Sequence, residues 1–334
     1  MTTAPLQTQA LMIGYRAPLI HPLDLALESG KLVCLIGPNG AGKSTLLRTL
    51  AGMQRPLRGS VTITGIDVHR MSAAERSRHL SIVLTERVQP GLLTGYGLVS
   101  LGRHPHTDWS GQLSARDIDV VQAAVTSVGA EDYAARPLTE LSDGQRQKLM
   151  IARALAQDAP VMLLDEPTAF LDLPRRVEMM ALLRRLARET NRAILLSTHD
   201  LDLALRTADR VWLIADGQFQ AGAPEDLVLS GAFEAAFRAH DVAFDSASGS
   251  FRLNIPGCVG VRLIGNGAVR AWTQHAIERA GYMMVDDAPL TITISTDASR
   301  TQWHVVDSDS SQACDSIEEL IAALSNVDTS RMTM

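Results

Sequence analysis

The stretch GPNGAGKS at Gly37–Ser44 has the residue types of a phosphate-binding loop. Phosphate oxygens need several N–H donors at short range, and glycines let backbone N–H groups approach without obstruction. The apolar run Lys31–Ile36 leads into the loop as a strand, and Thr45–Leu50 follows as a helix whose positive end faces the anion. Lys43 can reach the β- and γ-phosphates, and the Ser44 hydroxyl can bind Mg²⁺. The sequence therefore predicts nucleotide binding, in preference to a chance match in a flexible loop.

Two adjacent carboxylates, Asp165 and Glu166, follow the apolar run Val161–Leu164. Such a run is typical of a strand buried in a parallel sheet. An Asp at the end of that strand can hold the Mg²⁺ shell, and the neighbouring Glu can accept a proton from an attacking water. The alternative is that the two residues are solvated carboxylates of a surface loop. A buried strand that leads directly into them makes this alternative a poor explanation.

A third stretch, Leu141–Gln147, reads as the start of a helix shortly before Asp165. Ser142 is a predicted N-cap, Gly144 permits close approach, and the helix dipole adds affinity for an anion. Alone, this pattern is an ordinary helix start. Its position between the loop and the carboxylates favours a functional interpretation.

Strands alternate with helices through most of the chain, which predicts an α/β domain with a largely parallel sheet. Further strands are expected at Ala10–Tyr15, Leu23–Leu27, Gly59–Thr64, Ala193–Ser197 and Arg210–Ile214. Helices are expected at Ala115–Val128, at Gly144–Gln157 and from Pro174 onward.

The character of the chain changes near residue 240. Asp245–Ser250 is small and polar, as in a linker or long turn. Beyond it we expect strands at Val259–Ile264, Leu290–Ile294 and Trp303–Val306, a helix with Val269, Trp272, Ala276 and Ala280 on one face, and a capping box of Ser316 and Glu319. We therefore predict a main domain at 1–242, a linker at 243–250 and a small α+β accessory domain at 251–334. Gly265–Ala268 opens a helix after a strand, but Arg270 replaces the third glycine of a dinucleotide motif, so no second nucleotide site is expected.

Together these motifs resemble those of the ATP-binding-cassette (ABC) ATPases, over roughly residues 8–240. Gly37–Ser44 is similar to Walker A, Val161–Glu166 to Walker B and Leu141–Gln145 to the LSGGQ signature. The resemblance also identifies a D-loop at Thr168–Asp172, the switch histidine at His199 and the adenine-stacking aromatic at Tyr15. The nucleotide-binding residues that it implies are Tyr15, Gly37, Pro38, Asn39, Gly40, Ala41, Gly42, Lys43, Ser44, Thr45, Ser142, Gly144 and Gln145.

The resemblance implies a P-loop NTPase of ABC type, with a RecA-like core, an antiparallel β subdomain and a helical subdomain at about 87–158. Two subunits would face head to tail and clamp two ATP molecules. Each ATP would contact Walker A and B of one subunit and Ser142 and Gly144 of the other. His199 would contact the γ-phosphate and help to hold the catalytic Glu166, while Ser44 and Asp165 would bind Mg²⁺.

Two departures from the family pattern stand out. Asp143 occupies a signature position where glycine is usual, which adds negative charge near a phosphate. The Q-loop glutamine that normally ends a strand like Ser81–Leu84 is absent. Thr85 and Glu86 follow instead, and either could replace it.

Length, composition and charge exclude several classes of protein. The chain of 334 residues is 46% hydrophobic, enough for a sizeable core. Its net charge of −6 argues against binding to nucleic acid. It has no run of about 18 apolar residues and no secretion signal. Its cysteines, Cys34, Cys258 and Cys314, lie far apart, so a disulfide framework or zinc site is not expected and a reducing, cytosolic setting fits best.

A finer resemblance points to the bacterial importers of iron-siderophores, haem and cobalamin. It rests on Leu98–Pro105, Leu141–Lys148 and Asp165–Asp172. It implies a homodimer at the cytoplasmic face of the inner membrane, peripheral through a permease dimer that docks near Glu86–His106, and a substrate-binding protein as an indirect partner. His104 and His106 lack a third ligand, so no metal site is expected there. The alternative is a soluble ABC ATPase that acts on a macromolecule or in cluster assembly. For the accessory domain, regulation is the favoured role.

Overall fold

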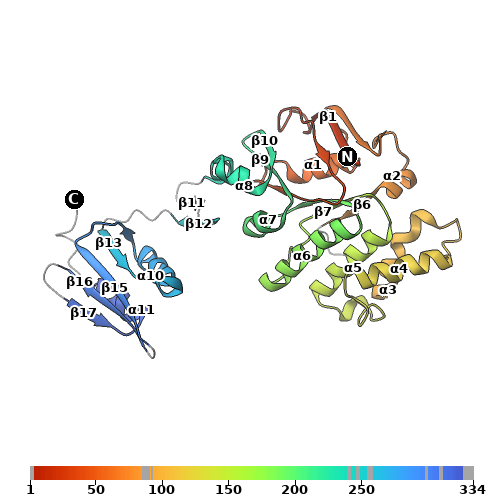
Figure 1. The fold of residues 1–334 in the computed structure, drawn as a ribbon. Helices are drawn as coiled ribbons and strands as arrows, with labels where there is room; N and C mark the ends of the chain where they lie inside the picture. The colour runs from red at the N-terminus through yellow and green to blue at the C-terminus, as the bar shows by residue number, and fades with distance from the viewer. Residues whose placement is uncertain are drawn as a thin grey trace. The chain divides into compact units, whose positions relative to one another are not determined.

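The computed structural model describes residues 4–84, 91, 93–238, 242–245, 249–253, 259–297, 300–307 and 311–325. The chain divides into two compact units, Met1–Arg238 with Phe244–Phe251, and Ala239–Ala243 with Arg252–Met334. Figure 1 shows the helices and strands of both units. Within the described ranges, no helix combines the length and apolar character needed to cross a membrane.

A six-stranded sheet forms the centre of the first unit. Its order is β10 (Gln218–Gly222), β9 (Arg210–Ala215), β3 (Leu32–Ile36), β8 (Ala193–Ser197), β7 (Val161–Asp165) and β6 (Leu80–Val83). All neighbours are parallel except β10, which pairs antiparallel with β9. The predicted parallel α/β sheet is therefore confirmed. Because the strands run in one direction, the residues that follow β3, β7 and β8 meet at one edge.

Alternate residues of the parallel strands bury on opposite faces of the sheet. Leu32, Cys34 and Ile36 of β3 belong to a core shared with helices α4 (Ala115–Ser127), α5 (Asp143–Ala156) and α6 (Leu173–Glu189). Val33 and Leu35 belong to a second core, shared with α1 (Lys43–Leu50) and the antiparallel sheet. The central strands are apolar on both faces because both faces are covered.

The antiparallel sheet has the order β2 (Ala26–Leu27), β1 (Leu6–Met12), β4 (Arg58–Ile63) and β5 (Ile66–Asp67). The expected strand Ala10–Tyr15 was misplaced. The register of β1 against β4 shifts between Gln9 and Met12, and Ala10 has a φ of 44°. The predicted start is thus the site of a bulge inside the strand. The expected strand at Leu23–Leu27 is shorter, with Leu23 in an isolated bridge to Leu11.

Several helices gather on one side of the first unit (Figure 1). These are α3 (Gly95–Ser100), the 3₁₀ helices η1 (Leu101–His106) and η2 (Leu138–Glu140), α4 and α5. Helix α3 packs against both α4 and α5. Helix α2 (Ala73–His79) precedes β6 and contacts η1.

An aromatic cluster ends the first unit. It joins α9 (Ala232–Phe237) to a hairpin of β11 (Val242–Asp245) and β12 (Ser250–Leu253). The Phe244 ring centroid lies 4.8 Å from that of Phe233 and 5.1 Å from that of Phe251. Residues expected to form a linker, 243–250, therefore carry parts of two strands. Phe244 among them, and Phe251 directly after them, pack onto Phe233 of α9. Helices α7 (Leu201–Thr207) and α8 (Pro224–Leu229) complete this unit.

The second unit is a five-stranded mixed sheet with two helices, as predicted for an α+β domain. Its order is β14 (Tyr282–Met284), β13 (Val259–Ile264), β15 (Leu290–Thr296), β16 (Thr301–Val306) and β17 (Ser311–Cys314), with helices α10 (Gly267–Arg279) and α11 (Ile317–Ser325).

Two details of the second unit differ from the sequence prediction. Trp272 of α10 is 67% exposed, and Thr273, Ala276 and Ile277 form the buried face instead. The Thr273 hydroxyl is satisfied there by the indole N–H of Trp303, which donates to it at 2.8 Å. At α11, Ser316 accepts from the Glu319 N–H at 3.1 Å, but the Glu319 carboxylate accepts from the Asp315 N–H, so only half of the predicted capping box forms.

Candidate active site

The phosphate loop, Gly37–Ser44, lies between the fully buried strand β3 and helix α1. A Cβ on Gly37 would lie 2.1 Å from the carbonyl oxygen of Ile214, so only glycine fits beside β9. Gly40 and Gly42 have φ values of 79° and 103°, in the left-handed region that favours glycine. Gly42 is the N-cap of α1 and uses no side chain for capping. The N-terminal N–H groups of α1 therefore remain suited to an anion, as the sequence predicts.

Lys43 lies within this loop rather than in solvent. Its Nζ donates to the carbonyl oxygens of Gly37 at 2.7 Å and Pro38 at 3.0 Å. Burial lowers its pKa below the ordinary value, and the nearby Glu166 and Asp165 carboxylates oppose that shift. The loop cation and both acidic residues therefore belong to one electrostatic site.

One hydroxyl organises the two carboxylate residues. Asp165 of β7 pairs in register with Ser197 of β8. Ser197 Oγ donates to Asp165 Oδ1 at 2.6 Å and accepts from the Glu166 N–H at 3.0 Å. Ser197 is 1% exposed, so its hydroxyl is fixed by these bonds. No sequence motif marks Ser197, and the only available signal was its place at the end of a strand, two residues before His199.

Glu166 and His199 are in direct contact. His199 Nε2 lies 2.5 Å from Glu166 Oε1. Glu166 has a φ of 50°, an unusual conformation for a residue with a side chain, which the Ser197 bond to its N–H helps to hold. Both side chains line an open pocket of about 490 Å³. Its other lining residues are Thr168, Ala169, Arg176, Thr198, Asp200, Leu201, Asp202 and Phe251.

Tyr15 lies in the connection that follows β1 and is 68% exposed. Leu19, in the same connection, lies 3.3 Å from the position that a Cβ on Gly42 would take. This connection therefore runs beside the phosphate loop. An exposed aromatic ring there can stack on a nucleotide base.

The signature stretch, Leu141–Gln145, lies at the start of α5. Ser142 is the N-cap and forms a capping box with Gln145, which confirms the predicted cap. Ser142 is exposed. The Asp143 carboxylate forms an ion pair with Arg146 at 2.6 Å, so a cation on the same helix offsets the added charge. Gly144 leaves room for the Arg175 side chain, since a Cβ there would lie 3.0 Å from its guanidinium.

The predicted D-loop leads into α6, where Asp172 is the N-cap and accepts from the Arg175 N–H at 3.0 Å. Arg176, one residue further, lies 3.6 Å from Asp200, which caps α7 directly after His199. The ion pair links the first turn of α6, which follows the D-loop, to the segment that carries His199. Thr85 and Glu86, the two candidates to replace the Q-loop glutamine, lie outside the described residues.

The site offers hydrogen-bond donors for the phosphates of ATP and oxygen ligands for Mg²⁺. The loop offers unobstructed N–H groups and a buried lysine for phosphates. Ser44 and Asp165 offer hydroxyl and carboxylate oxygens, the ligands that Mg²⁺ prefers. At η1, the His106 ring contacts the carbonyl oxygen of Gln157 at 2.9 Å.

Comparison with known proteins agrees with this geometry. Residues 20–169 match the family described as ABC transporter, and residues 258–325 match the iron ABC transporter C-terminal domain. An uncharacterised ABC transporter ATP-binding protein of Methanocaldococcus jannaschii is 41% identical over 250 residues, which cover 74% of this chain and 86% of the relative. The achromobactin transport ATP-binding protein of Dickeya dadantii is 43% identical over 223 residues, 66% of this chain and 83% of the relative.

A solved metal-chelate type ABC transporter in an inward-facing conformation is similar in fold, with a TM-score of 0.62 and 29% identity over 71% of this chain and 89% of that chain. A second solved relative is the cbiO1 protein of Clostridium perfringens, part of an ABC transporter complex. Its TM-score is 0.61, with 26% identity over 70% of this chain and 93% of that chain.

Proposed function

This chain belongs to the ABC transporter family of ATP-binding proteins, and from that premise we propose that it powers uptake of an iron-siderophore, haem or cobalamin-type chelate. It does so by binding and hydrolysing ATP next to a separate permease. The observation that carries the ATPase assignment is the meeting of Lys43, Asp165, Glu166 and His199 at the ends of adjacent parallel strands. The importer assignment is supported by relatives named for achromobactin and iron(3+)-hydroxamate transport.

Each residue of the site has a role in this proposal. Lys43 and the loop N–H groups bind the β- and γ-phosphates. Ser44 and Asp165 would hold Mg²⁺, which supplies positive charge to the phosphates when bound. Glu166 accepts a proton from the attacking water, and His199 orients the Glu166 carboxylate through the contact at 2.5 Å. Tyr15 stacks on the adenine.

The signature residues Ser142, Gly144 and Gln145 act on the ATP of a second copy of this chain. The exposure of Ser142 supports this role, because an N-cap at the surface can present the helix start to a partner's phosphate. Asp172 and its D-loop would lie at the same interface. The active site is therefore complete only in a head-to-tail dimer.

We place the permease contact at 86–106 in the helical subdomain, taken as about 87–158. The protein would then be peripheral at the cytoplasmic face of the membrane, and a substrate-binding protein would deliver the chelate to the permease. We assign the cassette to 1–242 and a regulatory domain to 251–334, joined by the linker residues 243–250, of which Phe244 packs onto α9. The match of 258–325 to the iron ABC transporter C-terminal domain supports a separate domain there, and its regulatory role is part of the proposal.

The import proposal is tested by first searching the genomic neighbourhood for a metal-chelate permease gene and then co-expressing that permease with this protein. We expect the two to co-purify, and the ATPase rate of the complex in liposomes to rise when chelate-loaded binding protein is added. A chain that stays unpaired, with an ATPase rate indifferent to the permease, would instead favour the ABC ATPase that acts on a macromolecule or in cluster assembly.

A further inference from the structure

The 3₁₀ segment η1 is packed tightly onto the end of the signature helix. A Cβ on Gly102 would lie 2.2 Å from the carbonyl oxygen of Arg153 and 3.0 Å from the Ala156 Cβ. Only a glycine permits this approach of the η1 backbone to the last turn of α5. The two elements therefore cannot separate or slide without breaking buried contacts.

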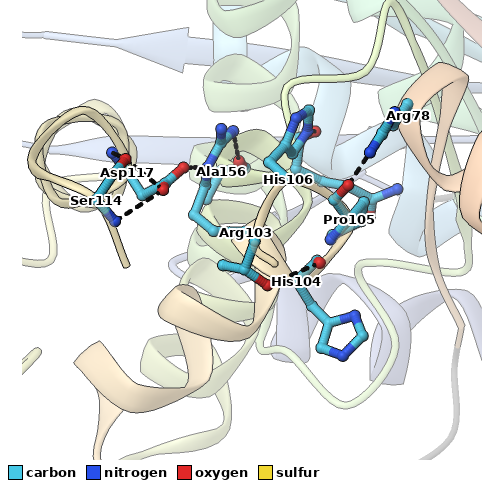
Figure 2. Close-up of polar contacts among 10 residues, drawn as sticks. Arg78, Arg103, His104, Pro105, His106, Ser114, Asp117 and Ala156 are labelled. Carbon is cyan, nitrogen blue, oxygen red and sulfur yellow. Dashed lines mark hydrogen bonds and ion pairs between the residues drawn. The ribbon is translucent and has the colours of Figure 1, made fainter. Parts of the chain in front are cut away.

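Arg103 fixes this contact through its guanidinium, and it is 4% exposed. Its Nε donates to Asp117 Oδ1 at 2.8 Å, and its Nη1 donates to the carbonyl oxygen of Ala156 at 2.7 Å (Figure 2). One side chain of η1 thus binds the first turn of α4 and the last turn of α5. The carbonyl groups at a helix C-terminus carry partial negative charge, which favours a cation there.

Asp117 is held in place for this contact. Its Oδ2 accepts from the Ser114 N–H at 3.0 Å and from the Ser114 hydroxyl at 2.6 Å, which forms the capping box of α4 (Figure 2). The bonds from Ser114 and Arg103 lower the pKa of Asp117 to about 2. The carboxylate is therefore ionised at neutral pH and carries the negative charge that pairs with Arg103.

Three more polar contacts tie η1 to the entry of β6. Arg78 of α2 donates to the carbonyl oxygen of Pro105 at 2.9 Å (Figure 2). The His106 ring contacts the Gln157 carbonyl oxygen at 2.9 Å, and the Gln157 side chain donates to that of Leu80 at 2.7 Å. Strand β6 then leads toward residues 85–90. Leu101 of η1 is 51% exposed, and Trp109, three residues beyond η1, is 98% exposed, so each offers apolar surface to a partner.

We propose that Arg103 is a positioning residue, which transmits movement of the permease-facing segment η1 to the signature stretch at the other end of α5. Helix α5 is continuous from Asp143 to Ala156, so a displacement of its last turn also moves Ser142 and Gly144. A buried ion pair adds little net stability, because desolvation offsets the attraction; its use is to fix one arrangement of the parts. This inference rests on the proposed function, which supplies the permease.

Arg103→Lys tests the inference, since lysine keeps the charge but lacks the planar fork that reaches two acceptors. We expect the isolated subunit to hydrolyse ATP within about twofold of wild type and to co-purify with the permease as before. Stimulation of ATPase by loaded binding protein, and uptake, should both fall by about tenfold, within the usual range of coupling between sites. Arg136→Lys is the matched control, because Arg136 forms an exposed ion pair with Glu140 in the same subdomain.

The paired substitution Arg103→Met with Asp117→Leu covers the case in which Arg103→Lys folds poorly, because it leaves no buried charge unpaired. We expect it to show the same split between basal and stimulated activity. The inference is overturned by normal stimulation in both variants, or by an equal loss of basal and stimulated activity, which would mark a merely structural role. A wild-type chain that fails to bind the permease would refute the proposed function itself, independently of any Arg103 variant.

Discussion

At the residue scale, the two carboxylate residues of the site depend on a hydroxyl that no motif marks. Ser197 bonds to both the Asp165 side chain and the Glu166 backbone, and so sets the position of the proposed Mg²⁺ ligand relative to the proposed general base. Groups that orient a ligand or base from behind usually matter nearly as much as the ligands themselves. The sequence predicted the acidic pair and His199, but a serine at a strand end has no distinguishing pattern. Its role emerges only from the register of β7 against β8.

Ser197→Ala should therefore slow hydrolysis by about 10- to 100-fold, as for other residues that orient a metal ligand. We expect ATP binding to persist, since the phosphate loop is untouched, and a higher Mg²⁺ concentration to be needed for half-maximal rate. Ser81→Ala is the matched control, because Ser81 is also fully buried in this sheet, on β6. Equal hydrolysis rates in the two variants would show that the Ser197 hydroxyl does not position the site.

At the element scale, periodicity predicted strands and helices well where burial is regular. The bounds of β8 and β13 match the sequence prediction, because both are short apolar or alternating runs. Errors arose where local pattern and tertiary environment disagree. Trp272 was expected on the buried face of its helix, yet Thr273 takes that place through its bond with Trp303. The hairpin of β11 and β12 was not predicted from the sequence, because the small, polar residues between its two phenylalanines are typical of a linker.

That hairpin predicts a difference between two truncations. A chain that ends at Leu253 retains the contacts of Phe244 and Phe251 with Phe233. Its cassette should therefore unfold at the same denaturant concentration as the cassette of the full-length chain. A chain that ends at Arg238 loses both rings, and we expect about 3 kcal/mol less stability, as for deletion of a buried phenylalanine. Hydrogen exchange in α9 measures the loss. Identical unfolding of the two chains would contradict the role of the hairpin.

The longer chain also tests whether the residues beyond Leu253 regulate ATPase activity or uptake.

At the scale of the whole molecule, we propose that one chain carries two separate parts of a nucleotide site. The phosphate loop, Asp165, Glu166 and His199 gather at the edge of the parallel sheet. Ser142 lies exposed at the start of α5. Residue types predicted the phosphate loop and the acidic pair, whereas the role of Ser142 was implied by the resemblance to the ABC ATPases. That Thr85 or Glu86 replaces the Q-loop glutamine stays a prediction. The choice between the two residues depends on backbone geometry, which residue types alone do not specify.

The most direct test of the central claim, hydrolysis by Glu166 in a dimer, is Glu166→Gln studied with ATP and Mg²⁺. We expect ATP binding to be retained and hydrolysis to fall by about 10²- to 10⁴-fold, as for loss of a general base. Light scattering should then show an ATP-dependent dimer that persists. Glu178→Gln, the same change on an exposed position of α6, should leave hydrolysis normal and the dimer transient. If Glu166→Gln hydrolysed ATP as fast as Glu178→Gln and formed no lasting dimer, the account of this active site would be wrong.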